Sequence, residues 1–318
     1  MIVTVTPNPA VDKIYWVDRL KMAKETQDEF LTRATSSNTS AGGKGVNTSV
    51  FLSRLGVENT AMGFVGGHVG HVVVRDLRNE GVTTNFVWIK GETRTNVIVL
   101  EQGHEYVPIM IDEPGPAISQ DEIDRLVRRY KRMLKRASWV ILAGSLPPGV
   151  DGNLYRDLAE LASQEEKKVV ISAGQNELSR GLLAKPYIVK PDIRVTPVFD
   201  GHPLKTESEI IDAGEKIISQ GVGVVIVSHE VTGDIAITKD GIWEISAPVQ
   251  TKEFKNFVGA DDALLGGIVY MLDKGENLTD ALRFGMAAGL TSAESGHKIC
   301  SNLDRIARSM EMVSISRL

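Results

Sequence analysis

The chain has 318 residues, a net charge of −5 and 42% apolar residues, which is typical of one large soluble domain or two modest ones. No apolar run approaches the roughly 18 residues of a membrane helix, and no basic run favours a nucleic acid partner. The N-terminus does not resemble a signal peptide, and the single cysteine, Cys300, excludes an internal disulfide network. We therefore expect a cytoplasmic protein that binds neither membranes nor nucleic acids.

Short β-branched runs alternate with amphipathic segments, and the two patterns predict buried strands and helices respectively. In chain order, we expect a strand at 2–6, a helix at 44–55, a strand at 60–64, helices at 69–79 and 120–136, a strand at 139–143, a helix at 153–164, strands at 168–171 and 188–190, a helix at 207–219, a strand at 222–228, and helices at 260–272 and 278–292. This alternation predicts an α/β fold in which a mostly parallel sheet carries helices on both faces.

Two segments interrupt the alternation. Residues 15–35 and 93–111 have the polar alternation of extended or hairpin segments. We expect them to form a small, separate sheet, a lid over one end of a single domain that spans residues 1–318. A sheet of this kind exposes one face, which predicts a homodimer formed lid to lid.

The segment NFVGADD at residues 256–262 leads directly into an apolar helical segment. A turn of small residues before a helix presents backbone N–H groups and the positive end of the helix dipole, which suit a phosphate in transit. The carboxylate of Asp262 beside this turn suits a general base that accepts a proton from an attacking hydroxyl.

A second glycine-rich turn, SAGGKGVN at residues 40–47, also leads into a helix. Its glycines let a ligand approach the backbone closely, with Lys44 adding positive charge and Asn47 a polar contact one turn later. The spacing is not that of a Walker A loop, and such a turn alone is more often only a tight connection. The segment TPNPAVDK at 6–13 follows the first strand, where ligands of α/β sheets gather, so Asp12 is well placed to accept hydrogen bonds from hydroxyls.

Further motifs follow in a defined order: GFVGGHVG at 63–70, TRTNV at 93–97, PGP at 114–116 and LAGSLPPGV at 142–150. Together with the two glycine turns, this series resembles the branch of the ribokinase/PfkB family that contains 1-phosphofructokinases and tagatose-6-phosphate kinases. The resemblance runs from residue 1 to about residue 292. Asp262 matches the catalytic aspartate of the family's Gly-Ala-Gly-Asp signature, and Asp261 replaces the signature's second glycine.

The resemblance implies a ribokinase-like fold with a β-sheet lid, and ATP-dependent, Mg²⁺-assisted phosphorylation of fructose 1-phosphate or tagatose 6-phosphate. The residues it implies for catalysis are Gly259, Ala260 and Asp261 in the anion hole and Asp262 as the base. Those it implies for substrate binding are Asp12, Gly42, Gly43, Lys44, Asn47, Arg94, Gly144 and Ser145. Among these, Lys44 and Arg94 are the counter-charges for the substrate's phosphate, which an arginine can bind with two parallel hydrogen bonds.

The nucleotide side departs from the family pattern. The residues at its cofactor-binding positions are Lys190, Asp192, Ser228, Glu230 and Gly233. Asp192 stands where the family usually has asparagine, Val195 where it has glutamate, and Glu230 where it has glycine; Phe257 replaces a threonine or serine. Added carboxylates repel a polyanion unless a cation or Mg²⁺ compensates them. The alternative interpretation is therefore a non-catalytic or regulatory protein that binds a sugar phosphate and has a degenerate nucleotide site.

Overall fold

A computed structural model of the chain describes residues 1–21, 31–105, 107–193, 198–199, 202–204, 206–230, 232–250 and 253–318. Of Phe199, His202, Pro203 and Glu230 it describes the backbone only. Val195, the side chain of Glu230, residues 22–30 of the first interrupting segment and Tyr106 of the second therefore lie outside the described residues.

The strands are β1 (Ile2–Thr6), β2 (Ala10–Val17), β3 (Ala34–Gly42), β4 (Asn59–Val65), β5 (Thr83–Thr84), β6 (Val87–Trp88), β7 (Arg94–Glu101), β8 (Ile109–Asp112), β9 (Trp139–Ala143), β10 (Lys168–Ala173), β11 (Ile188–Pro191), β12 (Val198–Phe199), β13 (His202–Pro203), β14 (Val224–Glu230), β15 (Gly233–Thr238), β16 (Gly241–Ser246) and β17 (Ser314–Arg317). The helices are α1 (Lys44–Arg54), α2 (Gly67–Asn79), α3 (Gln120–Leu134), α4 (Asn153–Gln164), α5 (Gln175–Gly181), α6 (Glu207–Ser219), α7 (Ala260–Asp273), α8 (Leu278–Glu294) and α9 (Leu303–Met312). All the predicted elements are present, and their ends differ from the prediction by at most two residues.

Within the described residues, eleven strands form the main sheet in the order β17-β16-β15-β14-β11-β10-β9-β1-β4-β5, with β6 also paired to β4. The strands from β14 through β11, β10, β9, β1 and β4 run parallel, whereas β15, β16 and β17 add an antiparallel edge. The predicted mostly parallel α/β sheet is confirmed. The antiparallel edge was not predicted, although Asp240 and Gly241 between two alternating runs are a hairpin signal.

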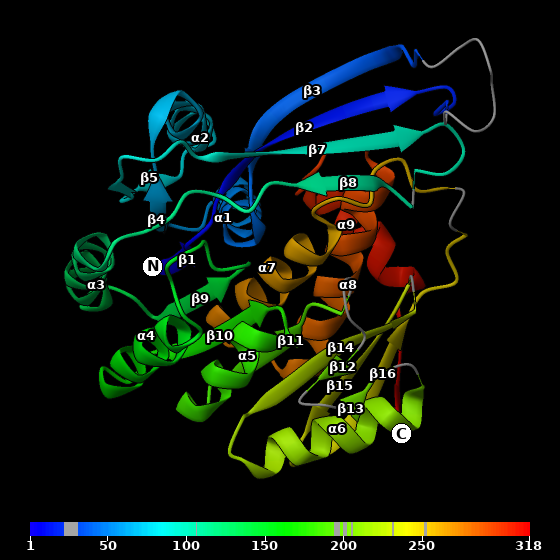
Figure 1. The fold of residues 1–318 in the computed structure, drawn as a ribbon. Helices are drawn as coiled ribbons and strands as arrows, with labels where there is room; N and C mark the ends of the chain where they lie inside the picture. Colours follow the sequence, from blue (N-terminus) through cyan, green and yellow to red (C-terminus); the bar gives the residue numbers. More distant parts are fainter. Residues whose placement is uncertain are drawn as a thin grey trace.

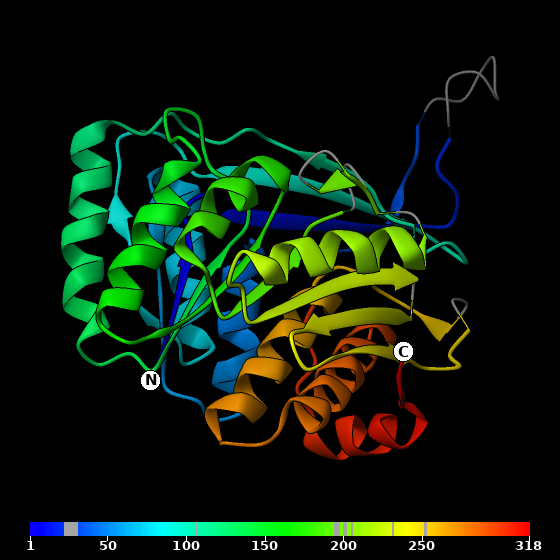
Figure 2. The same cartoon turned by 90° about the horizontal axis from the view of Figure 1, so that it is seen from below.

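Helices cover both faces of this sheet (Figure 2). Because side chains alternate along a strand, Val140 and Leu142 pack into the cluster formed with α3, α4, α5 and α6. Trp139 and Ile141 of the same strand pack into the opposite cluster, formed with α1, α7, α8 and α9. No helix in the described part of the chain is long and apolar enough to cross a membrane.

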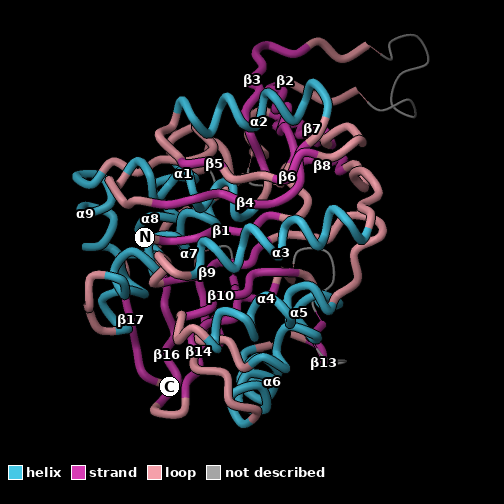
Figure 3. Tube along the Cα trace, turned by 90° about the vertical axis from the view of Figure 1, so that its left-hand side faces the viewer, coloured by secondary structure: helices cyan, strands magenta, loops and turns pink. Residues whose placement is uncertain are grey.

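A second sheet, here called the small sheet, has the order β3-β2-β7-β8 and extends above one end of the main domain (Figure 1). The predicted small, separate sheet is therefore confirmed, but the bounds of its first segment were wrong. Of residues 15–35 only 15–17 and 34–35 are in strands, because β2 starts at Ala10 and β3 runs from Ala34 to Gly42. Its base is anchored where α2 lies beside it (Figure 3), because Val11 and Ala41 join a buried cluster with Val73 of α2. The position of β2 directly after β1 places its first residues at the carboxyl end of the main sheet.

Candidate active site

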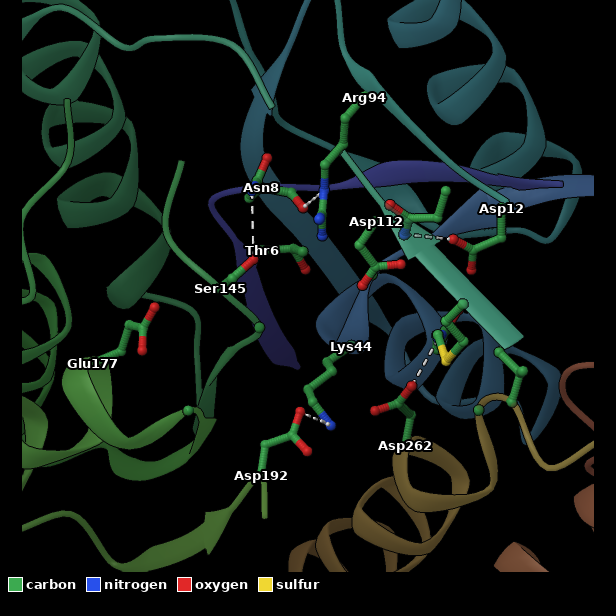
Figure 4. Close-up of a pocket in the computed structure, with 18 of the residues that line it drawn as sticks. Thr6, Asn8, Asp12, Lys44, Arg94, Asp112, Ser145, Glu177, Asp192 and Asp262 are labelled. Atoms are coloured by element: carbon green, nitrogen blue, oxygen red, sulfur yellow. Dashed lines mark hydrogen bonds and ion pairs between the residues drawn. The ribbon is translucent and has the colours of Figure 1, made fainter. Parts of the chain in front are cut away.

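A cleft of about 400 Å³ lies between the small sheet and the carboxyl ends of the main strands (Figure 4). Its lining comes from segments far apart in the chain: Thr6, Asn8, Asp12, Gly43, Lys44, Asn47, Arg94, Asn96, Met110, Asp112, Gly144, Ser145, Gly174, Gln175, Asn176, Glu177, Asp192, Val258, Gly259 and Asp262. In Figure 4, Arg94 lies at one side of this space, and Lys44, Asp192 and Asp262 lie at the other. The cleft therefore has a cationic side chain at each end, Arg94 and Lys44, with carboxylates beside both.

The strand register of the small sheet places its polar side chains on the cleft. Asp12 of β2 lies opposite Asn96 of β7, and Asn96 in turn lies opposite Asp112 of β8. Arg94 is two residues before Asn96, so alternation puts it on the same face. All four of these side chains line the cleft, which means that one face of the small sheet forms its roof.

Two helices begin at the cleft. Gly43 precedes α1 with φ +104°, and Gly259 precedes α7 with φ +85°, backbone conformations that favour glycine. At Gly43 the backbone also passes closely over the main sheet, since an added Cβ would lie 3.0 Å from Cγ2 of Thr6. The positive ends of both helix dipoles thus face a cavity that contains Lys44, an arrangement that attracts anions.

Asp262 lies in the first turn of α7, and its side chain is held in place from α1. Nδ2 of Asn47 donates a hydrogen bond of 2.7 Å to Oδ2 of Asp262, and Oγ1 of Thr48 donates one of 3.3 Å to its backbone carbonyl. Its own N–H donates to the carbonyl of Gly259 at 3.1 Å. The carboxylate is buried yet lines the cleft, the placement that a general base requires.

Several buried acceptors in the cleft have no hydrogen-bond partner among the described residues. They are Oγ1 of Thr6 and the Oδ1 atoms of Asn8, Asn47 and Asn96, and all four residues line the cavity. A buried polar atom left unpaired is destabilising by about 1–3 kcal/mol, so a group of them in one cavity indicates a ligand that supplies donors. Sugar hydroxyls are donors of this kind.

Arg94 is a partly buried cation beside these acceptors. Its Nε donates to the carbonyl of Asn8 at 3.2 Å, and its Nη1 to the carbonyl of Glu113 at 3.0 Å. Burial lowers the pKa of Arg94, while the charges of Asp112 and Asp12 oppose that shift. An anionic ligand at this end of the cleft would stabilise the guanidinium further.

Of the remaining residues predicted for substrate binding, Gly144 and Ser145 line the cleft, whereas Gly42 does not and lies behind Asp12. Gly42 makes room for Asp12, since an added Cβ would lie 2.3 Å from the Asp12 carboxyl group. Gly144 has φ +94°, and its carbonyl accepts a hydrogen bond of 2.9 Å from the buried Tyr155 hydroxyl. Oγ of Ser145 accepts one of 3.4 Å from Asn8. Gly144 and Ser145 line the cavity, as predicted residues near the ligand would.

A second cavity of about 290 Å³ adjoins the cleft, and Lys44, Asp192, Gly259 and Asp262 line both. Much of its lining is apolar, from Ile193, Phe257, Leu264, Met286, Leu290 and Ala293. Of the predicted cofactor-binding residues, Asp192, Ser228 and Gly233 line it, together with Ala260 and Asp261 of the catalytic turn. The two cavities therefore meet at the N-terminus of α7.

The two aspartates that depart from the family pattern on the nucleotide side, Asp261 and Asp192, each lie beside a lysine. Lys190 is buried beneath the second cavity, with its Nζ 3.1 Å from Oδ1 of Asp261, 3.5 Å from Oδ1 of Asp234 and 2.7 Å from Oγ of Ser228. Burial by itself would lower the pKa of Lys190, but the carboxylates of Asp261 and Asp234 raise it above its usual value. Lys44 lies 3.3 Å from Asp192 in the same way. The charge repulsion expected from Asp192 and Asp261 is therefore reduced by a cation beside each carboxylate, although Lys190 is shared between Asp261 and Asp234.

Magnesium requires only one or two protein carboxylates when it also binds phosphates and water. Within the described residues, no group of three or more His, Cys, Asp or Glu side chains is placed to hold a metal ion. Asp192 and Asp262 line both cavities, so a carboxylate is available on each side of their junction. This donor set fits a Mg²⁺ ion that arrives with a nucleotide.

Three residues in or behind the cleft were not predicted from the sequence: Asn96 and Glu177 line it, and Lys298 contacts Asp12 from behind. Asn96 stands two residues after Arg94 in a predicted extended segment, so strand alternation would have identified it. Glu177 lines the cavity from the start of α5, a helix that was not predicted. Lys298, whose Nζ lies 2.9 Å from Oδ2 of Asp12, carries no local signal because the contact spans 286 residues.

Comparison with known proteins gives consistent matches over nearly the whole chain. The family model described as "pfkB family carbohydrate kinase" matches residues 6–303, which include every residue of the two cavities. The chain is 32% identical to a 1-phosphofructokinase of Borreliella burgdorferi over 93% of both chains. It is 30% identical to a D-tagatose-1-phosphate kinase of Bacillus licheniformis over 99% of this chain and 100% of that one.

Solved structures show the same similarity. A possible 1-phosphofructokinase of Thermotoga maritima superposes with a TM-score of 0.91 at 33% identity, covering 100% of this chain and 99% of the other. Phosphofructokinase-2 of Escherichia coli, at 24% identity, superposes with a TM-score of 0.84 over 98% of both chains. The ribokinase-like arrangement of the two sheets is thus shared at low sequence identity.

Proposed function

This chain belongs to the pfkB family of carbohydrate kinases, and on that premise we propose that it transfers a phosphoryl group from ATP to a hydroxyl of a ketohexose phosphate. Fructose 1-phosphate is the proposed substrate, because the Borreliella burgdorferi relative is named 1-phosphofructokinase and the Thermotoga maritima structure possible 1-phosphofructokinase. Tagatose 1-phosphate is the alternative suggested by the Bacillus licheniformis relative. Tagatose 6-phosphate, the other substrate expected from the sequence, differs in the position of its phosphate.

The observation that carries this proposal is the wall shared by the two cavities. A polar cleft with buried acceptors suits a sugar, an adjoining cavity with an apolar lining suits an adenine nucleotide, and Asp262 lies where they meet. Phosphoryl transfer depends on such positioning, in which the sugar and the nucleotide are held on either side of one general base, Asp262.

In the sugar cleft, the unpaired acceptors of Asn47 and Asn96 and the carboxylate of Asp12 would bind substrate hydroxyls. Arg94, at the far end from Asp262 (Figure 4), would bind the phosphate that the substrate already carries. A ketohexose phosphate oriented in this way directs its unphosphorylated end toward Asp262. We propose that the small sheet acts as the lid over this ligand.

At the junction, Asp262 would accept the proton of the attacking hydroxyl while Asn47 holds its carboxylate in place. The hydroxyl oxygen forms the new bond to the γ-phosphorus, and the bond between that phosphorus and the β,γ-bridging oxygen breaks, so that ADP leaves with the bonding electrons. Lys44 and the Gly259–Asp262 turn would stabilise the charge on the phosphoryl group in transit. Mg²⁺, held through Asp192, would neutralise charge on the nucleotide phosphates.

The non-catalytic alternative rested on carboxylates that repel a nucleotide. Asp261 and Asp192 each have a lysine beside them, at 3.1 Å and 3.3 Å, although Lys190 is shared between Asp261 and Asp234. These pairs support a nucleotide cavity that still accepts ATP, and they favour the kinase over the binding protein.

The proposed function is tested by a coupled assay for ADP release with fructose 1-phosphate, tagatose 1-phosphate and tagatose 6-phosphate, alongside calorimetric titrations of ATP with and without Mg²⁺. We expect ATP binding and sugar-phosphate-dependent ADP release. Sugar-phosphate binding without either ATP binding or turnover would instead support the non-catalytic alternative.

Replacing Arg94 with alanine is expected to weaken sugar-phosphate binding by about 1.5–3 kcal/mol, the contribution of a hydrogen bond to a charged group. Binding of unphosphorylated fructose should barely change, because the sugar hydroxyls contact other residues. Calorimetry with both ligands measures the difference, with Arg128→Ala on the exposed face of α3 as the control. Equal losses for both ligands would show that Arg94 does not recognise the phosphate.

We also propose that two small sheets pair in a homodimer. Alternation directs Met110 and Asp112 of β8 into the cleft, so Ile109 and Ile111 lie on the outer face, where they are 43% and 61% exposed. Light scattering at micromolar concentration should give a dimer mass for the wild type and a monomer mass for Ile111→Asp. Leu183→Asp, at another exposed apolar site, is the control. A monomeric wild type would contradict the proposal.

A further inference from the structure

A buried lysine near the opposite end of the chain contacts Asp12, a residue that lines the proposed sugar cleft. Lys298 lies between α8 and α9, and its Nζ is 2.9 Å from Oδ2 of Asp12 and also donates a hydrogen bond to the carbonyl of Ala41. Both charged side chains are almost entirely buried, with exposed fractions of 8% and 5%. Removing one partner of such a pair leaves an uncompensated charge in the interior, which is costly.

The contacts of Asp12 define its orientation. Oδ2 faces Lys298, while Oδ1 accepts a hydrogen bond of 3.0 Å from Nδ2 of Asn96. Gly42 lies against the same carboxyl group, and an added Cβ there would approach to 2.3 Å. The carboxylate is thus held from three sides, by β7, β3 and the Lys298 segment, at the edge of the cleft that it lines.

The same lysine also packs against the turn that precedes α7. A Cβ added at Gly259 would lie 2.6 Å from the backbone oxygen of Lys298 and 3.1 Å from its Cγ. Gly259 lines both cavities. One residue therefore contacts the small sheet through its ammonium group and the turn beside Asp262 through its backbone and side-chain stem.

We propose that Lys298 is a positioning residue for the reaction. It directs the Asp12 carboxylate at the sugar through its ammonium group, while its backbone and stem pack against the Gly259 turn. The proposal rests on the kinase function proposed above, and it adds a residue that none of the glycine-rich motifs contains. Lys298 touches neither the sugar nor the nucleotide in this assignment; it acts through Asp12.

The test is a set of variants at Lys298, measured by steady-state kinetics. Lys298→Met removes the ammonium group and keeps most of the stem. We expect KM for the sugar phosphate to rise by about 10-fold or more, the equivalent of losing the charged hydrogen bond between Asp12 and a sugar hydroxyl, while KM for ATP stays the same. Lys255→Met, an exposed lysine near the same segment, makes the same charge change and should behave as the wild type.

Two further variants separate positioning from folding. Combining Lys298→Met with Asp12→Asn removes the uncompensated carboxylate, so the melting temperature should recover while the sugar-phosphate KM remains high. Lys298→Arg keeps the charge. Lys298 also lines a cavity of about 300 Å³ together with Asn38, Ser40 and other residues, and this cavity has room for the longer side chain. The KM of this variant for the sugar phosphate should therefore lie close to the wild-type value.

The proposal is overturned if Lys298→Met lowers the melting temperature but leaves KM for the sugar phosphate unchanged. It is also overturned if KM for ATP rises equally, or if Lys298→Arg behaves like Lys298→Met. If the wild type shows no turnover, the proposed function fails, and calorimetry of the sugar phosphate with the wild type and the same variants decides the role of Lys298 separately.

Discussion

Asp262→Asn is expected to slow turnover by about 10²–10⁴-fold, the usual effect of removing a general base, with little change in sugar-phosphate affinity. An asparagine at this position has nearly the same shape, and its amide oxygen can accept the hydrogen bond that Asn47 donates to Oδ2 at 2.7 Å. The cleft would therefore keep its geometry while losing the group that accepts the proton. ADP-release kinetics and sugar-phosphate calorimetry measure the two quantities on the same preparation.

The control is Asp273→Asn at the far end of α7, where the side chain is exposed and accepts a hydrogen bond from Ser138. It makes the same chemical change on the same helix and should retain full turnover. Robust turnover in Asp262→Asn would place the base elsewhere and would remove the main chemical assignment of this site.

Lys190→Met is expected to destabilise the protein by about 3–5 kcal/mol, the range for breaking a buried ion pair from one side, and to abolish measurable ATP binding. The substitution leaves the carboxylates of Asp234 and Asp261 without their cation, directly beneath the cavity proposed for the nucleotide. Desolvation of both carboxylates and their mutual repulsion would then act together. Urea denaturation measures the first effect, and ATP calorimetry below the unfolding transition measures the second.

The complementary variant Asp261→Gly restores the family residue and leaves Lys190 paired with Asp234. We expect only a modest change in ATP affinity, because Lys190 at 3.1 Å already screens the carboxylate that is removed. If Lys190→Met bound ATP as tightly as the wild type, the ion pair would not be what makes this cavity compatible with a nucleotide. A large gain in affinity for Asp261→Gly would lead to the same conclusion.

Local patterns were sufficient to predict most of the architecture. The run at 139–143 is apolar throughout, as expected for a strand covered on both faces, and β9 has these bounds. The glycine turns before residues 44 and 260 mark helix starts because only glycine adopts their positive φ easily, and α1 and α7 begin there. The cleft residues Asp12, Lys44 and Arg94 followed from motifs placed next to such elements.

What could not be predicted depends on contacts between distant segments. From the sequence, Asp261 is expected to add a repulsive charge. Its contact with Lys190 could not be predicted, because 71 residue positions separate the two residues. Lys298 lies beyond the last recognised motif, and only the packing of the segment after α8 brings it to Asp12. The sequence shows which charges are present, whereas the free energy of each charge depends on its partners and burial.

The pairing of β2 with β7 sets a rule for how this site can change during evolution. Asp12 lies opposite Asn96 and Ala10 opposite Arg94 in one continuous parallel register. Because the side-chain period of a strand is two residues, a one-residue insertion or deletion at Thr95 would place Arg94 and Asn96 on opposite faces of β7 unless a bulge absorbed it. The register between β2 and β3 already shifts at Trp16, away from the cleft. Substrate preference in this lineage should therefore diverge mainly by point substitution at cleft-facing positions, with single-residue length changes confined to places where a bulge leaves the cleft register intact.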